Sequence, residues 1–128
     1  MTPERNPADL LPLAPREFLV LLALAAGRSH GYGLIRETER LSDGRVAMDP
    51  ANLYRTLKRL VREGLVEDAG QAPSAEAGGE RRRYYEITAL GHRLVAAEAE
   101  RIGRLAEVAR ERALIPGAPR GSLRDSGR

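Results

Sequence analysis

Residues 49–64 constrain the fold more than any other part of the chain, because their pattern indicates one amphipathic helix with a defined start and end. Asp49 followed by Pro50 is typical of an N-cap and a first-turn proline, and Gly64 is typical of a helix stop. At about 100° per residue, one side of this helix is apolar. That side consists of Leu53, Leu57, Leu60 and Val61. A helix of this kind must bury its apolar side in a core.

The opposite side of the same helix is basic. Its residues are Arg55, Lys58, Arg59 and Arg62, with Asn52 near the start and Tyr54 at the boundary. Long basic side chains often cover a solvated helix without any partner. A nucleic-acid contact is the alternative, and it is favoured by Arg81, Arg82 and Arg83 at the tip of a predicted hairpin. A basic helix followed by a basic-tipped hairpin suits a DNA groove and its flanking phosphates, although the hairpin arginines could also be only a solubilising tip.

Composition limits the classes of protein that remain. The 128 residues carry a net charge of +3 with a sequence pI of about 9.8, which is compatible with a polyanionic partner. Lys58 is the only lysine, so arginine supplies the remaining basic contacts. The absence of cysteine excludes disulfides, thiolate metal sites and cysteine nucleophiles. Residues 1–15 are too polar for a signal peptide, and residues 18–26 are too short to span a bilayer. We therefore expect a cytoplasmic protein with no membrane contact.

The first half of the chain is predicted to contain two further helices. Residues 1–14 are expected to form a flexible arm, because prolines interrupt them. Residues 15–27 are apolar almost all round and should form the most buried helix. A second helix is expected from Ser29 or His30 to Asp43, with Tyr32 facing the core and His30 acting in capping or packing. Residues 45–47 could pair as a short third strand.

The second half is predicted to contain a hairpin and a long helix. Residues 65–67 and 83–87 indicate strands, with Tyr85 and Ile87 facing inward, and residues 69–80 indicate a mobile loop. Thr88 is a good N-cap for a last helix that ends near Leu114, and residues 116–128 are expected to be disordered. On that helix Glu98 is expected to lie on the solvated side.

Three helices followed by a hairpin are the order of a winged helix-turn-helix domain, predicted here over residues 15–88. The fold is therefore mainly α with a small β-hairpin wing, and residues 89–115 would add a C-terminal dimerisation helix. About 25 helical residues span ~38 Å, which is more than the small domain can cover. A homodimer would cover the remainder and would match a palindromic operator. The predicted interface residues are Phe18, Leu22, Leu90, Leu94, Ile102, Leu105 and Val108.

Several motifs in this order resemble the PadR family of bacterial transcriptional regulators. They are residues 30–33 (HGYG), 52–60 (NLYRTLKRL), 63–66 (EGLV) and 83–88 (RYYEIT), followed by Gly91. The resemblance implies a winged-helix repressor that dimerises through its C-terminal helix and often responds to small aromatic molecules. Two departures stand out. Family members often have proline where this chain has Arg55, and the tryptophan with which some relatives stack planar drugs is absent.

The candidate functions are a sequence-specific DNA-binding repressor and, as the alternative, a winged-helix module that binds protein without DNA. An enzyme is rejected, because His30 and His92 are the only histidines and the sequence has no phosphate loop or metal-ligand cluster. We therefore expect no catalytic residue, metal or cofactor. Asn52 and Arg55 suit adenine and guanine edges respectively. The predicted place for a small apolar or aromatic effector is near Phe18, Leu22, Leu94 and Ile102. The alternative is no ligand and control by the protein's own abundance, because aromatic residues are few.

Overall fold

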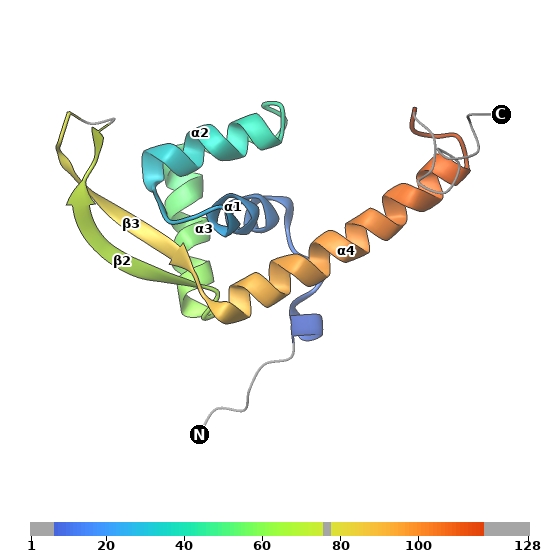
Figure 1. The fold of residues 1–128 in the computed structure, drawn as a ribbon, viewed down its shortest axis with the longest axis horizontal. Coiled ribbons are helices and arrows are strands. Elements are labelled where there is room, and N and C mark those ends of the chain that lie inside the picture. Colours follow the sequence, from blue (N-terminus) through green and yellow to red (C-terminus); the bar gives the residue numbers. More distant parts are fainter. Residues whose placement is uncertain (1–6, 76–77, 117–128) are drawn as a thin grey trace, which may run out of the picture.

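The computed structural model describes residues 7–75 and 78–116, and it confirms a mainly helical fold with a small wing. The elements in chain order are η1 (Pro7–Leu10), α1 (Pro15–Ala25), β1 (Ser29–His30), α2 (Gly31–Leu41), α3 (Pro50–Arg62), β2 (Val66–Pro73), β3 (Arg81–Ile87) and α4 (Ala89–Glu111). Helices α1, α2 and α3 form a cluster, the β2–β3 hairpin projects from one side of it, and α4 runs away from the base of the hairpin (Figure 1). This is the winged helix-turn-helix arrangement.

The core lies where the three helices of the cluster meet the first turns of α4. Its members are buried leucines and valines, joined by two smaller or more flexible side chains. They are Val20, Leu21, Ala23, Leu24, Leu34, Met48, Leu53, Leu57, Leu60, Leu65, Val66, Leu94 and Val95. The apolar side predicted for α3 is confirmed for its three leucines, whereas Val61 stays exposed. Burial of the leucine side directs the basic side of α3 away from the core.

The sheet has three antiparallel strands in the order β1-β3-β2. The edge strand β1 pairs Ser29 with Tyr85 and His30 with Tyr84. The prediction of a strand at residues 45–47 was therefore wrong. That segment instead contacts α1, where Arg16 donates a hydrogen bond from Nε to the carbonyl oxygen of Ala47 at 3.0 Å. The two residues before α2 pair with the wing in its place.

The wing is longer than the sequence predicted. β2 continues to Pro73 and covers the first part of the segment expected to be a mobile loop. A β-bulge between Asp68 and Gly70 permits this, because Gly70 adopts a φ of +84° and the ladder then resumes in register. Tyr85 and Ile87 pack against the core as expected.

The segment before α1 lies against the core and against α4. Leu10, Leu11 and Leu13 are partly buried against the core, and η1 contacts α4. The flexible arm expected over residues 1–14 stays a prediction, and the leucines of its second half cover apolar surface of the core. Residues 1–6 and most of the predicted tail, 117–128, lie outside the described part of the chain. No helix among the described residues has the length and apolar character that crossing a membrane requires.

The end of α3, the wing and the start of α4 meet at Thr88. Its hydroxyl donates to the carbonyl oxygen of Gly64 at 2.7 Å and accepts the amide N–H of Gly91 as the N-cap of α4. Its amide N–H donates to the carbonyl oxygen of Leu65. Gly91 lies so close to Leu65 that a β-carbon on Gly91 would overlap the carbonyl oxygen of Leu65. The absence of a side chain at Gly91 therefore lets α4 start against the base of the wing.

We predict opposite effects for two glycine-to-alanine changes in α4. Gly91→Ala should lower the free energy of unfolding by about 1–3 kcal/mol, because the backbone of Leu65 must move. Gly103→Ala is the matched control, since nothing lies within 4 Å of a β-carbon there. It should raise stability by about 0.5–1 kcal/mol through helix propensity. Urea unfolding followed by circular dichroism measures both, and equal effects would contradict the close contact at Gly91.

Candidate nucleic-acid interface

The local sequence fixes where α3 begins and which side it exposes. Asp49 caps the helix by accepting the amide N–H of Asn52 at 2.8 Å, and Pro50 occupies the first turn. Leu53, Leu57 and Leu60 are buried, so the side chains between them project outward. The exposed side carries Tyr54, Arg55, Lys58, Arg59 and Arg62 as predicted, with Asn52 half-buried at its leading end.

The two side chains predicted to read bases contact each other. Arg55 donates a hydrogen bond from its guanidinium to the side-chain oxygen of Asn52 at 2.8 Å. The pair lies one turn apart on the first half of α3, which is the part of a recognition helix that reaches the groove floor. The bond leaves the side-chain NH2 group of Asn52 and most N–H donors of Arg55 available to a partner.

The other basic residues of α3 differ in how they are held. Arg59 forms an ion pair with Glu17 of α1 at 3.1 Å, and its side chain remains largely exposed. The side chains of Lys58 and Arg62 make no hydrogen bond or ion pair with any residue that the structure describes. Their charges are therefore the least compensated on α3.

Tyr54 links α3 to the start of α2. Its side chain is 51% exposed, yet its hydroxyl would lie 2.5 Å from a β-carbon on Gly31. Gly31 therefore allows the tyrosine ring to lie against the first turn of α2. The hydroxyl consequently sits at the joint between the two helices of the helix-turn-helix.

Arg81 and Arg83 of the wing contact β2, whereas Arg82 contacts α2. Arg81 donates to the carbonyl oxygen of Gln71 at 2.9 Å, across the wing. Arg83 forms an ion pair with Asp68 at 2.6 Å. The pKa of Asp68 is lowered, first by the amide N–H of Gly70 and then by Arg83. Arg82 lies over the ring of Tyr32, 5.6 Å from its centre, so it is directed toward α2.

The contact between Arg82 and Tyr32 corrects one prediction and adds residues that the sequence did not indicate. Tyr32 is 48% exposed and does not belong to the core, because it lies at the start of α2 facing the wing. Arg36 also lies over its ring at 5.6 Å, and Arg28 lies over the ring of Tyr84 at 5.2 Å. These arginines add positive charge between α2 and the wing. Only the chain's path brings them together, and no spacing in the sequence signals it.

The residues predicted for a dimer interface fall into two groups. Leu94 is fully buried in the core of its own chain and cannot contact a second subunit, which corrects that part of the prediction. Phe18 and Leu90 are partly buried against the same core. The remaining residues have substantial exposure, and they are Leu22, Ile102, Leu105 and Val108. The last three lie in the second half of α4, where Ile102 still lines a hollow beside Phe18 of α1. Helix α4 as a whole runs away from the helical cluster (Figure 1).

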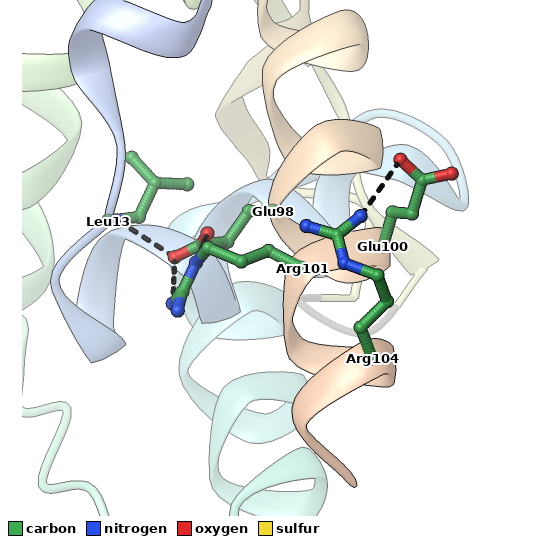
Figure 2. Close-up of polar contacts among 5 residues, drawn as sticks. All are labelled: Leu13, Glu98, Glu100, Arg101 and Arg104. Carbon is green, nitrogen blue, oxygen red and sulfur yellow. Dashed lines mark hydrogen bonds and ion pairs between the residues drawn. The ribbon is translucent and has the colours of Figure 1, made fainter. Parts of the chain in front are cut away.

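Glu98 was expected on the solvated side of α4, and this prediction was wrong. Its side chain is only 1% exposed, and Figure 2 shows it directed toward the segment before α1. The carboxylate accepts the amide N–H of Leu13 at 2.9 Å and two hydrogen bonds from Arg101 at 2.6 and 3.1 Å. Arg101 therefore lowers the pKa of Glu98 most, burial opposes it, and the Leu13 amide lowers it further. The pair ties α4 to the N-terminal segment.

Among residues 7–75 and 78–116, no group of three or more histidine, aspartate or glutamate side chains could hold a metal ion. His30 is buried and caps α2 by accepting the amide N–H of Gly33 at 3.1 Å, which confirms its predicted structural role.

An exposed basic helix beside an arginine-bearing wing defines the chain as a winged helix-turn-helix protein. Residues 20–97 match the model of the PadR-like family of transcriptional regulators, and the chain belongs to this family.

Solved structures share the fold. A PadR-like transcriptional regulator from Bacillus cereus is 22% identical with a TM-score of 0.65, over 78% of this chain and 92% of that one. Bacillus subtilis PadR in complex with operator DNA is 17% identical with a TM-score of 0.53, over 63% of this chain and 45% of that one. An uncharacterised 37.1 kDa transposon protein of Streptomyces fradiae is 37% identical over 89 residues. That match covers 70% of this chain but only 23% of the relative's length.

We predict a pH-dependent contribution of Glu98 to stability. Glu98→Gln should lower the free energy of unfolding by about 1–2 kcal/mol at pH 7, because the charge-assisted bonds to Arg101 weaken. Because the pKa of Glu98 is lowered in the folded chain, its contribution is complete above the unfolded value of about 4.3. It should disappear as the pH falls through the folded pKa, where wild type and variant converge.

Glu100→Gln is the matched control. Glu100 pairs with Arg104 at 3.7 Å on the exposed side of the same helix (Figure 2). Its loss should leave stability unchanged within error, as is usual for surface pairs. Thermal unfolding between pH 3 and pH 7 measures both variants. A Glu98→Gln effect that persists unchanged at pH 3 would contradict an ionised, paired Glu98.

Proposed function

We propose that this chain is a sequence-specific DNA-binding repressor that binds a palindromic operator as a homodimer. The observation that carries the proposal is the exposed basic side of α3, which stands beside a wing bearing three arginines. An α-helix fits the major groove of DNA, and flanking arginines suit the phosphates on either side. Membership of a family of transcriptional regulators supports this, as does the fold shared with a relative solved on operator DNA.

Each side chain of the interface has a proposed role. Asn52 and Arg55 would contact base edges, because they lie in the first half of α3 and suit adenine and guanine respectively. Lys58 and Arg62 would contact phosphates, and Tyr54 would add a hydroxyl donor. Arg83 can exchange its exposed partner Asp68 for a phosphate at low cost, because exposed ion pairs contribute little. Arg59 keeps most of its guanidinium exposed while it pairs with Glu17, so it can contact a phosphate from its free side.

Dimerisation is proposed through the second half of α4. Ile102, Leu105 and Val108 are exposed there, with Leu105 the most exposed of the three at 57%. A second copy would cover this apolar stripe, and two-fold symmetry would present two recognition helices to a palindrome.

An effector site is proposed at the junction of α1 and α4. A hollow of about 410 Å³ lies there, lined by Phe18, Val46 and Ile102 together with the Glu98–Arg101 pair. Of the four residues predicted for it, Phe18 and Ile102 line the hollow, whereas Leu22 lies outside its lining and Leu94 lies in the core. A small apolar or aromatic molecule bound there would alter DNA binding by favouring one orientation of α4.

The proposal includes no catalysis and no cofactor, and it places the protein in the cytoplasm with its DNA. The alternative is a winged-helix module that binds protein alone. Salt separates the two, because DNA binding weakens steeply with ionic strength as counterions are released. DNA fragments recovered from a genomic library by the purified protein would identify the operator. If the protein recovers no DNA fragment whose binding weakens as the salt concentration rises, the repressor proposal is overturned.

Arg55→Ala is expected to weaken binding to the best recovered site by about 1–3 kcal/mol and binding to random DNA much less. The reason is that a base-edge contact discriminates between sequences, whereas a phosphate contact does not. Arg112→Ala is the matched control, because it removes the same charge at the far end of α4. Fluorescence anisotropy on both DNAs measures the effect, and equal losses would assign Arg55 to phosphate.

Ile102→Asp is expected to weaken the dimer by about 3–5 kcal/mol, because it buries an unpaired charge in the proposed interface. Operator binding should fall with it. Gly103→Asp is the matched control, since it places the same charge one residue further along and about 100° around the helix. Sedimentation velocity at micromolar concentration distinguishes monomer from dimer. An intact Ile102→Asp dimer would locate the interface elsewhere.

A further inference from the structure

His30 contacts both the helix-turn-helix and the wing. It is 5% exposed, and its backbone pairs with Tyr84 of β3. Its Nδ1 accepts the amide N–H of Gly33, which caps α2. Its Nε2 lies 3.4 Å from the hydroxyl oxygen of Ser74, and its ring meets Tyr84 edge-on with centres 5.3 Å apart.

The hydrogen bonds assign the tautomer of the imidazole. A ring nitrogen that accepts an N–H carries no proton, so Nδ1 is unprotonated. The proton of the neutral ring is then on Nε2, where it can be donated to Ser74. One side chain therefore caps α2 at one nitrogen and holds the wing at the other.

Ser74 is well placed to transmit this contact to the wing arginines. It directly follows β2, it is 3% exposed, and its amide N–H donates to the carbonyl oxygen of Glu80 at 3.0 Å. Glu80 immediately precedes Arg81, and Pro73 pairs with Arg81 across the hairpin. Ser74 is thus fixed to the strand that carries Arg81 and Arg82. An isolated two-stranded hairpin is only marginally stable, so its outer end depends on such contacts.

We propose that His30 is a positioning residue that holds Arg81 and Arg82 of the wing at a set place relative to the recognition helix α3. The proposal rests on the proposed DNA-binding function and deepens it. His30 touches no DNA in this scheme. It acts by holding the outer end of the wing through Ser74, while the capping of α2 is a separate task of the same ring.

The two tasks can be separated by substitution. His30→Asn should keep the cap, because asparagine is among the best N-cap residues, but its shorter side chain cannot reach Ser74. Ser74→Ala removes the same link from the other side and leaves His30 intact. Ser42→Ala is the matched control, because it removes a serine hydroxyl at the opposite end of α2, where it accepts the amide N–H of Val46.

The readout is the affinity for the recovered operator as a function of salt. Both His30→Asn and Ser74→Ala should weaken binding about tenfold and make the salt dependence shallower by one or two phosphate contacts, as is expected when arginines leave the backbone. Ser42→Ala should change neither quantity. In a protein that already carries Arg81→Ala and Arg82→Ala, the His30 and Ser74 changes should have no further effect.

Three results would overturn the proposal. Unchanged affinity and salt dependence in both variants, with wild-type binding intact, would refute the role of His30 but leave the proposed function standing. A loss of equal size in the protein without Arg81 and Arg82 would show that His30 acts through stability alone. If the wild type itself shows no salt-dependent DNA binding, the proposed function fails and the positioning role fails with it. Ser74→Ala keeps the test decisive if His30→Asn unfolds.

Discussion

The hydrogen bonds of Thr88 are the constraint on which the working geometry of the chain depends. They join the end of α3, the base of the wing and the first turn of α4 at one place. Gly91 keeps this joint tight, because its missing side chain leaves room for the carbonyl of Leu65. The recognition helix and the long helix therefore meet without a flexible linker. A change in the direction of α4 would be passed directly to α3 and to the wing.

Charge is distributed unevenly over the interface, and this bears on how it would bind DNA. Arg59 and Arg83 already have carboxylate partners, whereas Lys58 and Arg62 have none among the described residues. The paired arginines are held in defined directions before any partner arrives, which lowers the ordering cost of binding. The surface thus combines guanidinium groups that are already oriented with exposed charges that have no carboxylate partner among the described residues.

Strong periodic patterns were predictable from the sequence, and contacts between distant segments were not. The apolar spacing of Leu53, Leu57 and Leu60 established α3, and Asp49 and Thr88 marked the starts of two helices. β1 has only two residues, too few for any alternation to show, and its pairing depends on where α1 places it. The spacing around Glu98 does indicate its burial. Glu98 lies four residues after Leu94 and four before Ile102, so it shares their side of α4. The charged residues around it suggested a solvated side instead.

The contact between Glu98 and Leu13 has a practical consequence for anyone who trims this protein. The carboxylate binds a backbone amide, so almost any residue at position 13 other than proline would preserve the bond. Comparison of related sequences would therefore give little warning that the position matters. α1 begins at Pro15, which makes that residue an attractive place to start a shortened chain. Such a chain would leave Glu98 with Arg101 alone, and α4 would lose its tie to the segment in front of α1.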